Sequence, residues 1–442
     1  MKYSIITFGC RVNQADSLEL EGALRGSGAS HASPDQADLV VVNTCSVTAS
    51  ADQGARQTIR RIARANPSAR IVVTGCYATR RPGEVGGLPN VAEVVPNDDK
   101  PRLVQLLRRS ETLSVGLSQA EGRSASAFQT TAERFGDGEG SCGADIEPGM
   151  AGRTAFTLRV QTGCAEPCSY CIIPSTRGRP RSIPVEEVAR EVRRVAAAGF
   201  REIVLTGVHL GSYGRDLTPA SSLYGLLRAL SAFSGVPDGT TRVLFRISSL
   251  EPMDCSPEIV ALVADHACFA SHFHLPLQHA SNRMLDAMRR PYTVEQYADL
   301  VDGIRARIPD ASIGSDIIVG FPGETGEDFE QLACYLEASP LTHVHVFPYS
   351  DRSGTAASVM TGKLPGTTVR ERARRLRGIS EQLAARFRAS QIGTVQQGLT
   401  LEDGSLVVTS NYLKVRIAAG RARNEWVKVR ITSHHDGQLL AG

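Results

Sequence analysis

Three short apolar segments within the first hundred residues each end in a cysteine. They read YSIITFGC, ADLVVVNTC and ARIVVTGC, and their last residues are Cys10, Cys45 and Cys76. Apolar runs of this kind are typical of buried strands, and helical sequence such as Ala51–Arg64 lies between them. Because strands that alternate with helices run parallel, their carboxyl ends meet along one edge of the sheet. We therefore predict an α/β domain with its three cysteines at the edge where such sheets bind ligands.

The beginning of the chain carries no secretion signal. The segment MKYSIITFGC enters the first apolar run directly, without the basic region, long apolar region and cleavage site of a signal peptide. The chain also lacks an apolar run of the roughly 20 residues that span a bilayer. We expect a cytoplasmic protein without a membrane partner. In that reducing compartment its ten cysteines are metal ligands, catalytic thiols or core residues rather than disulfides.

A second series of predicted strands and helices begins at Phe156. Its six apolar runs are FTLRVQTGC, EIVLTGVHLG, VLFRISSLEP, FHLPLQHAS, SIGSDIIVGFPGE and HVHVFPYS. Pro184 at its start and Gly199 just past its end mark the first helix between these runs. Six strand–helix units are fewer than the eight of a closed barrel. The pattern predicts a partial (β/α)6 barrel that is open on one side.

Composition changes twice more along the chain. Residues 118–152 are rich in Gly, Ser, Ala and acidic side chains and read as a linker. Residues 376–442 contain short apolar runs separated by turns, which predict a small five-stranded β-barrel. This tail has nine Lys and Arg against five Asp and Glu, and its Tyr412 and Trp426 lie near basic residues. Such a surface suits RNA, although a solvated basic face would have the same composition. We expect domains at 1–117 and 153–375, the linker at 118–152 and the barrel at 376–442.

Three cysteines lie close together in GCAEPCSYCIIPSTRGRPRS, at Cys164, Cys168 and Cys171. A structural zinc ion takes four ligands, and after this triplet the next Cys or His is His209. An iron–sulfur cluster can be held by three thiolates when its remaining iron takes an external ligand. The triplet follows the first predicted barrel strand, at the face where such barrels keep their active sites. We therefore favour a cluster over zinc or inert thiols.

The spacing C-x3-C-x-aromatic-C after the first strand of a partial barrel resembles the radical S-adenosylmethionine (SAM) enzymes. The resemblance implies a 4Fe–4S cluster on the triplet, with SAM on its open iron. Tyr170 matches the family's aromatic position beside the adenine of SAM, although it could simply be a packed aromatic. The other positions that match SAM contacts, where the glycines could equally be turn residues, are Thr206, Gly207, Gln278 and Gly320.

The whole chain is similar to the methylthiotransferases within that superfamily. Their first domain holds a second 4Fe–4S cluster on three cysteines, which Cys10, Cys45 and Cys76 match; without this resemblance the three could be core cysteines. The open iron of the second cluster carries the sulfur that is inserted. The C-terminal segment SNYLKVRI resembles the TRAM domain, an RNA-binding module. The implied fold is a parallel α/β domain, a partial radical SAM barrel and a small TRAM-like β-barrel.

Within the family, the chain is most similar to the branch that modifies N6-threonylcarbamoyladenosine beside the tRNA anticodon. The segments that carry this similarity are VNTCSVTASADQGARQTIRR, TGCYA and LTGVHLGSYGRDL. The resemblance implies that SAM, cleaved at the first cluster, gives a radical that removes hydrogen from carbon 2 of the adenine. Sulfur from the second cluster fills that position, and a second SAM supplies the methyl group. The six cysteines are thus the expected catalytic and metal-binding residues. The implied partners are tRNA, a low-potential electron donor and a sulfur or iron–sulfur supply system.

Three arginines follow the cysteine triplet, and two histidines alternate on a later predicted strand. Arg177, Arg179 and Arg181 are candidates for contacts with RNA phosphates or bases, with a solvated loop as the alternative. His343 and His345 alternate along one strand and are expected to be hydrogen-bonded core or pocket residues.

Three alternative functions stay open for the whole protein. They are the isopentenyladenosine branch, modification of an aspartate in a ribosomal protein, and a zinc-stabilised RNA-binding protein without catalysis.

Overall fold

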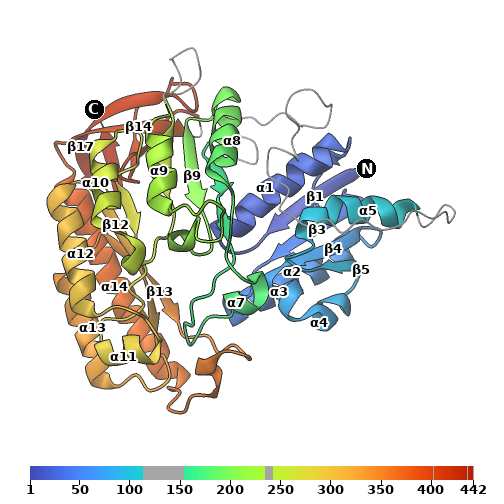
Figure 1. The fold of residues 1–442 in the computed structure, drawn as a ribbon, viewed down its shortest axis with the longest axis horizontal. Helices are drawn as coiled ribbons and strands as arrows, with labels where there is room; N and C mark the ends of the chain where they lie inside the picture. Colours follow the sequence, from blue (N-terminus) through green and yellow to red (C-terminus); the bar gives the residue numbers. More distant parts are fainter. Residues whose placement is uncertain (113–153, 234–241, 402, 436, 442) are drawn as a thin grey trace. The chain divides into compact units, whose positions relative to one another are not determined.

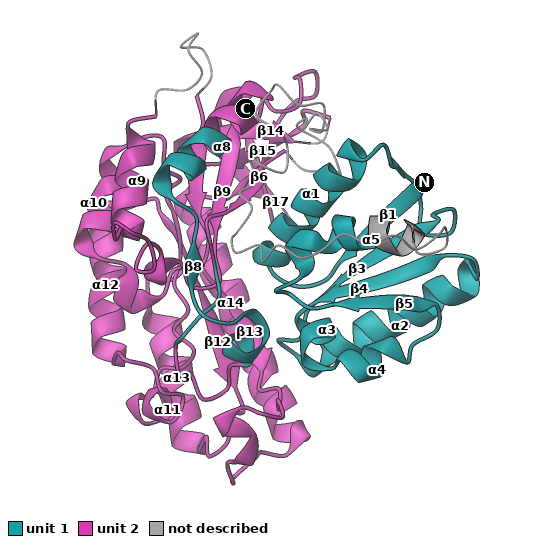
Figure 2. Cartoon of the chain, turned by 45° about the vertical axis from the view of Figure 1, so that its right-hand side comes forward, with its two compact units in different colours: residues 1–146, 162–165, 172–191 teal, residues 147–161, 166–171, 192–442 magenta. Residues whose placement is uncertain are grey.

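The computed structural model describes residues 1–112, 154–233, 242–401, 403–435 and 437–441, and the predicted linker 118–152 lies outside them. The chain divides into two compact units (Figure 2). Unit 1 consists of residues 1–146, 162–165 and 172–191, and unit 2 of residues 147–161, 166–171 and 192–442. Cys164 therefore belongs to unit 1, whereas Cys168 and Cys171 belong to unit 2.

Unit 1 is a parallel sheet covered by helices (Figure 1). Its elements are β1 (Lys2–Thr7), α1 (Arg11–Gly26), β2 (Ser30–His31), β3 (Leu39–Thr44), α2 (Ala49–Ala65), β4 (Arg70–Gly75), α3 (Cys76–Arg80), α4 (Pro82–Gly86), β5 (Val91–Val95), η1 (Lys100–Arg102), α5 (Leu103–Thr112), α7 (Ile173–Arg177) and β8 (Arg181–Ser182). The five-stranded sheet has the order β2-β1-β3-β4-β5, and all its strands are parallel. The three predicted cysteine-ending runs are the adjacent strands β1, β3 and β4, as expected for an α/β domain.

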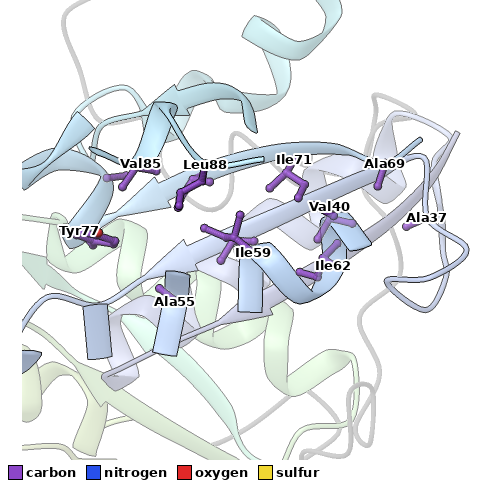
Figure 3. Close-up of a cluster of buried hydrophobic side chains, with 14 residues drawn as sticks. Ala37, Val40, Ala55, Ile59, Ile62, Ala69, Ile71, Tyr77, Val85 and Leu88 are labelled. Atoms are coloured by element: carbon purple, nitrogen blue, oxygen red, sulfur yellow. The ribbon is translucent and has the colours of Figure 1, made fainter. Parts of the chain in front are cut away.

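Each face of this sheet has its own core, because successive side chains of a strand point to opposite faces. On one face, Val40 and Ile71 pack against Ile59 and Ile62 of α2, as Figure 3 shows. On the other face, Val41 and its neighbours pack against α1 and α5. The strands are apolar on both faces and therefore read as continuous apolar runs.

Unit 2 begins with six parallel strands. They are β6 (Phe156–Arg159), β9 (Glu202–Thr206), β10 (Leu244–Ile247), β11 (His272–His274), β12 (Ser312–Val319) and β13 (His343–Pro348). They form two three-stranded sheets, β10-β9-β6 and β11-β12-β13, which a parallel bridge between Phe245 and Phe269 connects. This is the predicted partial (β/α)6 barrel.

The remaining elements of the barrel are mainly the helices that alternate with its strands, and of these β7 and α8 lie partly in unit 1. They are β7 (Gln161–Thr162), α8 (Val185–Ala197), η3 (Leu210–Ser212), α9 (Leu223–Ser231), η4 (Pro252–Asp254), α10 (Pro257–Asp265), α11 (Asn282–Ala287), α12 (Val294–Arg307), α13 (Gly326–Ala338) and η5 (Ala356–Val359). In the described parts of the chain, no helix is both long and apolar enough to cross a membrane.

The tail of unit 2 forms the predicted small barrel. Its elements are α14 (Gly366–Ser390), β14 (Val395–Leu401), β15 (Leu406–Thr409), β16 (Lys414–Arg416), β17 (Trp426–His435) and β18 (Gln438–Ala441). The five strands close in the order β14-β15-β16-β18-β17 around a valine-rich core. Helix α14 runs unbroken through residues 375 and 376, where the sequence suggested a domain boundary, so the barrel itself starts at Val395.

Tyr412 and Trp426, the two aromatic residues near basic side chains in this tail, take part in docking the barrel. The Trp426 Nε1–H donates to the Arg242 carbonyl oxygen at 3.1 Å, and the ring lies 5.2 Å from the Arg242 guanidinium. The Tyr412 ring lies 4.5 Å from the guanidinium of Arg246. Composition suggested an RNA surface for these residues, whereas the structure uses both to hold the β-barrel against the (β/α)6 barrel.

The docking contacts lie at the amino ends of the barrel strands. Asn424 donates to the Gly199 carbonyl oxygen, three residues before β9, and Asn411 to the Asp310 carbonyl oxygen, two residues before β12. The fully buried Arg246 bonds Glu202, the first residue of β9, at 2.7 Å. The C-terminal barrel therefore covers the end of the (β/α)6 barrel opposite to its strand carboxyl ends.

We expect Arg246→Met to destabilise this junction by about 3–5 kcal/mol, because it leaves the Glu202 carboxylate buried without its partner. Trp426 is the single tryptophan of the chain, so its fluorescence during urea unfolding reports on the junction directly. Arg246→Met/Glu202→Leu should recover much of the loss, since it removes both charges. Arg416→Met, at an exposed position of the same barrel, is the control. Equal unfolding midpoints for Arg246→Met and Arg416→Met would contradict this assignment.

Candidate metal centres

The three cysteines of the N-terminal sheet lie at neighbouring strand ends, as the sequence predicted. Cys10 lies between β1 and α1, Cys45 follows β3 directly, and Cys76 follows β4 and begins α3. Residue Thr7 pairs with Asn43, and Thr44 pairs with Gly75, so the last residues of the three strands are in register. Parallel pairing thus places the three thiols on one edge of the sheet.

A glycine precedes three of the six candidate cysteines, and the backbone requires it each time. Gly9, Gly75 and Gly163 have φ angles of +95°, +97° and +76°, which glycine adopts most readily. A Cβ on Gly9 would lie 2.7 Å from the Cys45 Sγ atom. A Cβ on Gly75 would lie 2.2 Å from the Thr44 carbonyl oxygen. The Gly–Cys dipeptides therefore let the cysteine loops pack against one another.

Burial controls the chemistry of these thiols. Cys45 and Cys76 are buried, whereas Cys10 is exposed. Burial raises the pKa of Cys45 to about 12, and the nearby Cys10 and Cys76 act in the same direction. Since the thiolate is the form that binds metal, positive charge from a bound metal has to offset this cost.

The three thiols of this edge come from three separate strand ends. Among the residues that the structure describes, no three Cys, His, Asp or Glu side chains are placed to hold one metal ion. A 4Fe–4S cluster binds each cysteine at a different iron and so spreads its ligands more widely. Cys10 and Cys76 lie close enough to Cys45 to contribute to the raised pKa of its thiol.

Asparagines fix the loops that carry these thiols. The Asn13 side-chain amide donates to the carbonyl oxygens of Phe8 and Thr44, at 2.7 and 3.0 Å, and so joins the loops of Cys10 and Cys45. Asn97 Nδ2 lies 3.7 Å from Cys76 Sγ and donates to the Thr176 carbonyl oxygen at 2.8 Å. The sequence analysis predicted no role for either asparagine. Asn13 follows Cys10 by three residues, whereas Asn97 is distant in sequence from the cysteine motifs and contacts them only in the fold.

A buried charged group lies behind the same edge. Asp16 of α1 accepts from Lys100 Nζ at 2.7 Å and from Arg177 at 3.2 Å. Arg177 also donates to the side-chain oxygen of Asn13. Only 3% of Arg177 is exposed, which does not fit the RNA contact predicted for it. Arg179 is exposed, and Arg181 pairs with Asp98 near the surface at 3.1 Å.

The second set of thiols has a short backbone link of its own. The Cys171 N–H donates to the Cys168 carbonyl oxygen at 3.1 Å within unit 2. In unit 1, the Cys164 N–H donates to the carbonyl oxygen of Gly178 at 3.0 Å. These bonds hold the loop that follows β7.

A buried arginine that sequence reasoning missed contacts this second set. Arg290 donates to Cys168 Sγ at 3.2 Å and to the Tyr292 hydroxyl oxygen at 3.0 Å. Its guanidinium also pairs with the Glu251 carboxylate. Burial lowers the pKa of Arg290, but the Glu251 carboxylate together with Tyr170, Tyr292 and Cys168 outweighs that effect, and the pKa is raised overall. A permanent positive charge therefore lies against one ligand of the predicted SAM cluster.

Four of the five positions matched to SAM contacts lie at carboxyl ends of barrel strands. Thr206 ends β9 and Gly207 follows it, Gln278 follows β11, and Gly320 follows β12. Gln278 has a left-handed φ of +68°, a conformation that the loop must stabilise. The fifth position, Tyr170, packs against an apolar cluster that includes Met288 and Phe321.

Further hydrogen bonds shape these strand ends. Gln161 Oε1 accepts from the backbone N–H groups of Val208 and His209, at 2.9 Å each, and so fixes the loop after β9. The Gly320 N–H donates to the Glu324 carboxylate at 2.7 Å. His343 and His345 lie beside His274, and burial lowers the pKa of His343 to about 4. His343 is thus neutral and partly buried, in line with a pocket residue, whereas His345 is exposed and does not fit the core or pocket position predicted for it.

Two family models match the chain. The uncharacterized protein family UPF0004 matches residues 2–95, and the radical SAM superfamily matches residues 158–336. The first match covers Cys10, Cys45 and Cys76, and the second covers Cys164, Cys168 and Cys171. The superfamily match implies S-adenosylmethionine and a 4Fe–4S cluster for this chain.

Relatives match over nearly the whole length. The threonylcarbamoyladenosine tRNA methylthiotransferase MtaB of Aquifex aeolicus is 36% identical, covering 98% of this chain and 100% of the relative. The MtaB of Bacillus subtilis is 34% identical, covering 92% and 88%. The tRNA-2-methylthio-N(6)-dimethylallyladenosine synthase of Acidothermus cellulolyticus is also 34% identical, covering 99% and 84%.

Among solved structures, the fold is similar to that of TsrM from Kitasatospora setae, a radical SAM methyltransferase with cobalamin and a [4Fe-4S] cluster bound. The TM-score is 0.56 at 17% sequence identity, over 81% of this chain and 77% of TsrM. Both family models, the full-length relatives and the two sets of three thiols agree, and the chain belongs to the radical SAM methylthiotransferase family.

Proposed function

We propose that this protein is a tRNA methylthiotransferase that converts N6-threonylcarbamoyladenosine next to the anticodon to its 2-methylthio derivative. The full-length similarity to MtaB enzymes is the observation that carries the proposal. The presence of one set of three thiols in each α/β domain supports the reaction type, because sulfur insertion and radical formation need separate centres. We place the reaction in the cytoplasm, with tRNA as the substrate.

In this proposal each set of cysteines holds one 4Fe–4S cluster. Cys164, Cys168 and Cys171 hold the cluster that binds SAM, and Cys10, Cys45 and Cys76 hold a second cluster. Together with SAM, the clusters supply one-electron chemistry, the inserted sulfur and the methyl group. An external low-potential donor delivers the electron, and a sulfur or iron–sulfur supply system restores the second cluster.

The polypeptide positions these groups and keeps water away from them. Arg290 stabilises the Cys168 thiolate through a charge-assisted hydrogen bond. Gln161 holds the loop after β9 in place, so that Thr206 and Gly207 can line the SAM site. Tyr170, Gln278 and Gly320 complete the set that we assign to SAM.

RNA contacts fall to exposed basic residues. Arg179 is exposed, with its backbone against Gly163, which precedes Cys164, and Arg181 is partly exposed. The C-terminal barrel adds basic side chains that alternate with its buried ones on β16 and β17, such as Lys414, Arg416 and Lys428. These outward positions can contact phosphates without disturbing the barrel core.

A second candidate substrate is the dimethylallyl-type adenosine. Relatives named as tRNA-2-methylthio-N(6)-dimethylallyladenosine synthases match this chain at similar identity and coverage. The cysteine sets themselves do not distinguish between the two substrates. The MtaB relatives that match over full length favour threonylcarbamoyladenosine.

Deletion of the gene should abolish 2-methylthio-N6-threonylcarbamoyladenosine in total tRNA, while its unthiolated precursor accumulates. Mass spectrometry of tRNA nucleosides measures both. The wild-type gene restores the nucleoside, and a gene with Cys168→Ala does not, because the SAM cluster loses a ligand. Loss of the dimethylallyl-type derivative instead would assign the second candidate substrate. Unchanged levels of every methylthio nucleoside would refute a tRNA function.

Anaerobically reconstituted protein should hold about eight iron atoms per chain, the content of two 4Fe–4S clusters. Removal of either cysteine set should reduce the iron content to about four atoms per chain. The two variants are Cys10→Ala/Cys45→Ala/Cys76→Ala and Cys164→Ala/Cys168→Ala/Cys171→Ala. Iron and sulfide analysis gives the count. Cys334→Ser, at an exposed cysteine of α13, should retain the full iron content. Stoichiometric zinc in a colourless protein would rule out both cluster sites.

A further inference from the structure

The segment that follows Cys171 belongs to the N-terminal unit and supplies it with a charged side chain. Residues 172–191 are part of unit 1, where α7 (Ile173–Arg177) packs against α3 (Cys76–Arg80) (Figure 2). Asn97 bonds Thr176 and reaches Cys76 Sγ, so it connects the end of α7 to a thiol of the N-terminal set. This arrangement places Arg177, the last residue of α7, behind the N-terminal thiols.

The guanidinium of Arg177 is fixed by three side chains of unit 1. It donates to Asn13 Oδ1, to Asp16 Oδ2 at 3.2 Å and to Thr162 Oγ1 at 3.4 Å. Its Nε–H is buried and makes no hydrogen bond to any described residue. Burial lowers the pKa of Arg177, but Asp16 and then the thiols of Cys76 and Cys10 raise it, and the pKa is raised overall.

The local charges are not balanced. Asp16 is one carboxylate, and it lies against two basic groups, Lys100 and Arg177. Burial lowers the pKa of Lys100 while the Asp16 carboxylate opposes that shift, and the guanidinium of Arg177 stays charged whatever the state of Lys100. The guanidinium of Arg177 thus stays charged near the thiols of the N-terminal set, and the group of three carries a net positive charge when Lys100 is protonated, in a buried environment where charge interactions are strong.

We propose that Arg177 is a positioning residue of the cluster held by Cys10, Cys45 and Cys76, and that its charge raises the reduction potential of that cluster. The inference rests on the proposed function, since it requires a cluster on these cysteines. A fixed positive charge stabilises the more negative, reduced state of a cluster over the oxidised state. Arg177 also steadies the loops through Asn13, which bonds the backbone just before Cys10 and Cys45.

The test isolates the N-terminal cluster in a Cys164→Ala/Cys168→Ala/Cys171→Ala protein. In this background, Arg177→Gln should retain the cluster but make it harder to reduce. At a fixed potential near the original midpoint, the ratio of reduced to oxidised cluster should fall at least tenfold, equivalent to 59 mV for one electron. A redox titration followed by electron paramagnetic resonance measures the ratio, and iron analysis runs alongside.

Two further variants separate charge from packing. Arg177→Lys keeps the positive charge but loses the forked geometry, so its reduction ratio should stay close to that of the parent. Arg25→Gln removes an arginine that pairs with Glu21 at the far end of α1, roughly 22 Å along the helix from Cys10. This control variant should leave the potential unchanged.

Each outcome decides one question. A parent protein that binds no iron would refute the second cluster and leave the role of Arg177 without a basis. Iron-loaded Arg177→Gln with an unchanged reduction ratio would overturn the charge role while the second cluster stands. If Arg177→Gln loses its iron, the Arg177→Lys variant decides between the charge role and a structural role. An Arg177→Lys protein that keeps both its iron and the parent reduction potential supports the charge role. Loss of iron in both variants would reduce Arg177 to a structural residue.

Discussion

The buried carboxylate of Asp16 organises unit 1. It lies on α1 near the N-terminal thiols and contacts Lys100 from η1 and Arg177 from α7. A carboxylate in this position is costly unless it is paired, and removal of one partner of a buried pair costs about 3–5 kcal/mol. Asp16 therefore fixes three segments that are distant in sequence, and with them the backbone that carries the cysteines.

A similar pairing occurs beside the other set of thiols. Arg290 pairs with Glu251 and donates directly to Cys168 Sγ, whereas Arg177 pairs with Asp16 and is held by Asn13. In both places a carboxylate orients a buried guanidinium, and the guanidinium offsets the negative charge of thiolates. For Cys45 the nearby guanidinium of Arg177 favours the thiolate, but burial outweighs it, so a bound metal has to supply the remaining stabilisation.

Much of the architecture follows from local patterns in the sequence. Apolar runs and their spacing predicted the parallel N-terminal sheet, the six strands of the partial barrel and the small β-barrel. They also predicted that Cys10, Cys45 and Cys76 share one edge, because parallel strands leave little choice. Local patterns cannot predict ion pairs such as that between Arg177 and Asp16, because these residues are 161 positions apart in the sequence. Basic composition likewise could not show that Tyr412 and Trp426 help to dock the β-barrel, because their partners Arg246 and Arg242 lie far away in the sequence.

The attachment point of the C-terminal barrel imposes a length on the substrate. The barrel is bound at the amino ends of the (β/α)6 strands, and the SAM positions lie at their carboxyl ends. Strand β12 between these ends has eight residues and spans about 26 Å. An RNA that is held by the barrel while one of its bases reacts must extend along that distance. A free nucleoside can occupy the SAM end of the strands alone and makes no contact with the C-terminal barrel. The distance between the two ends therefore favours a long, structured RNA over a free nucleoside, before any base is recognised.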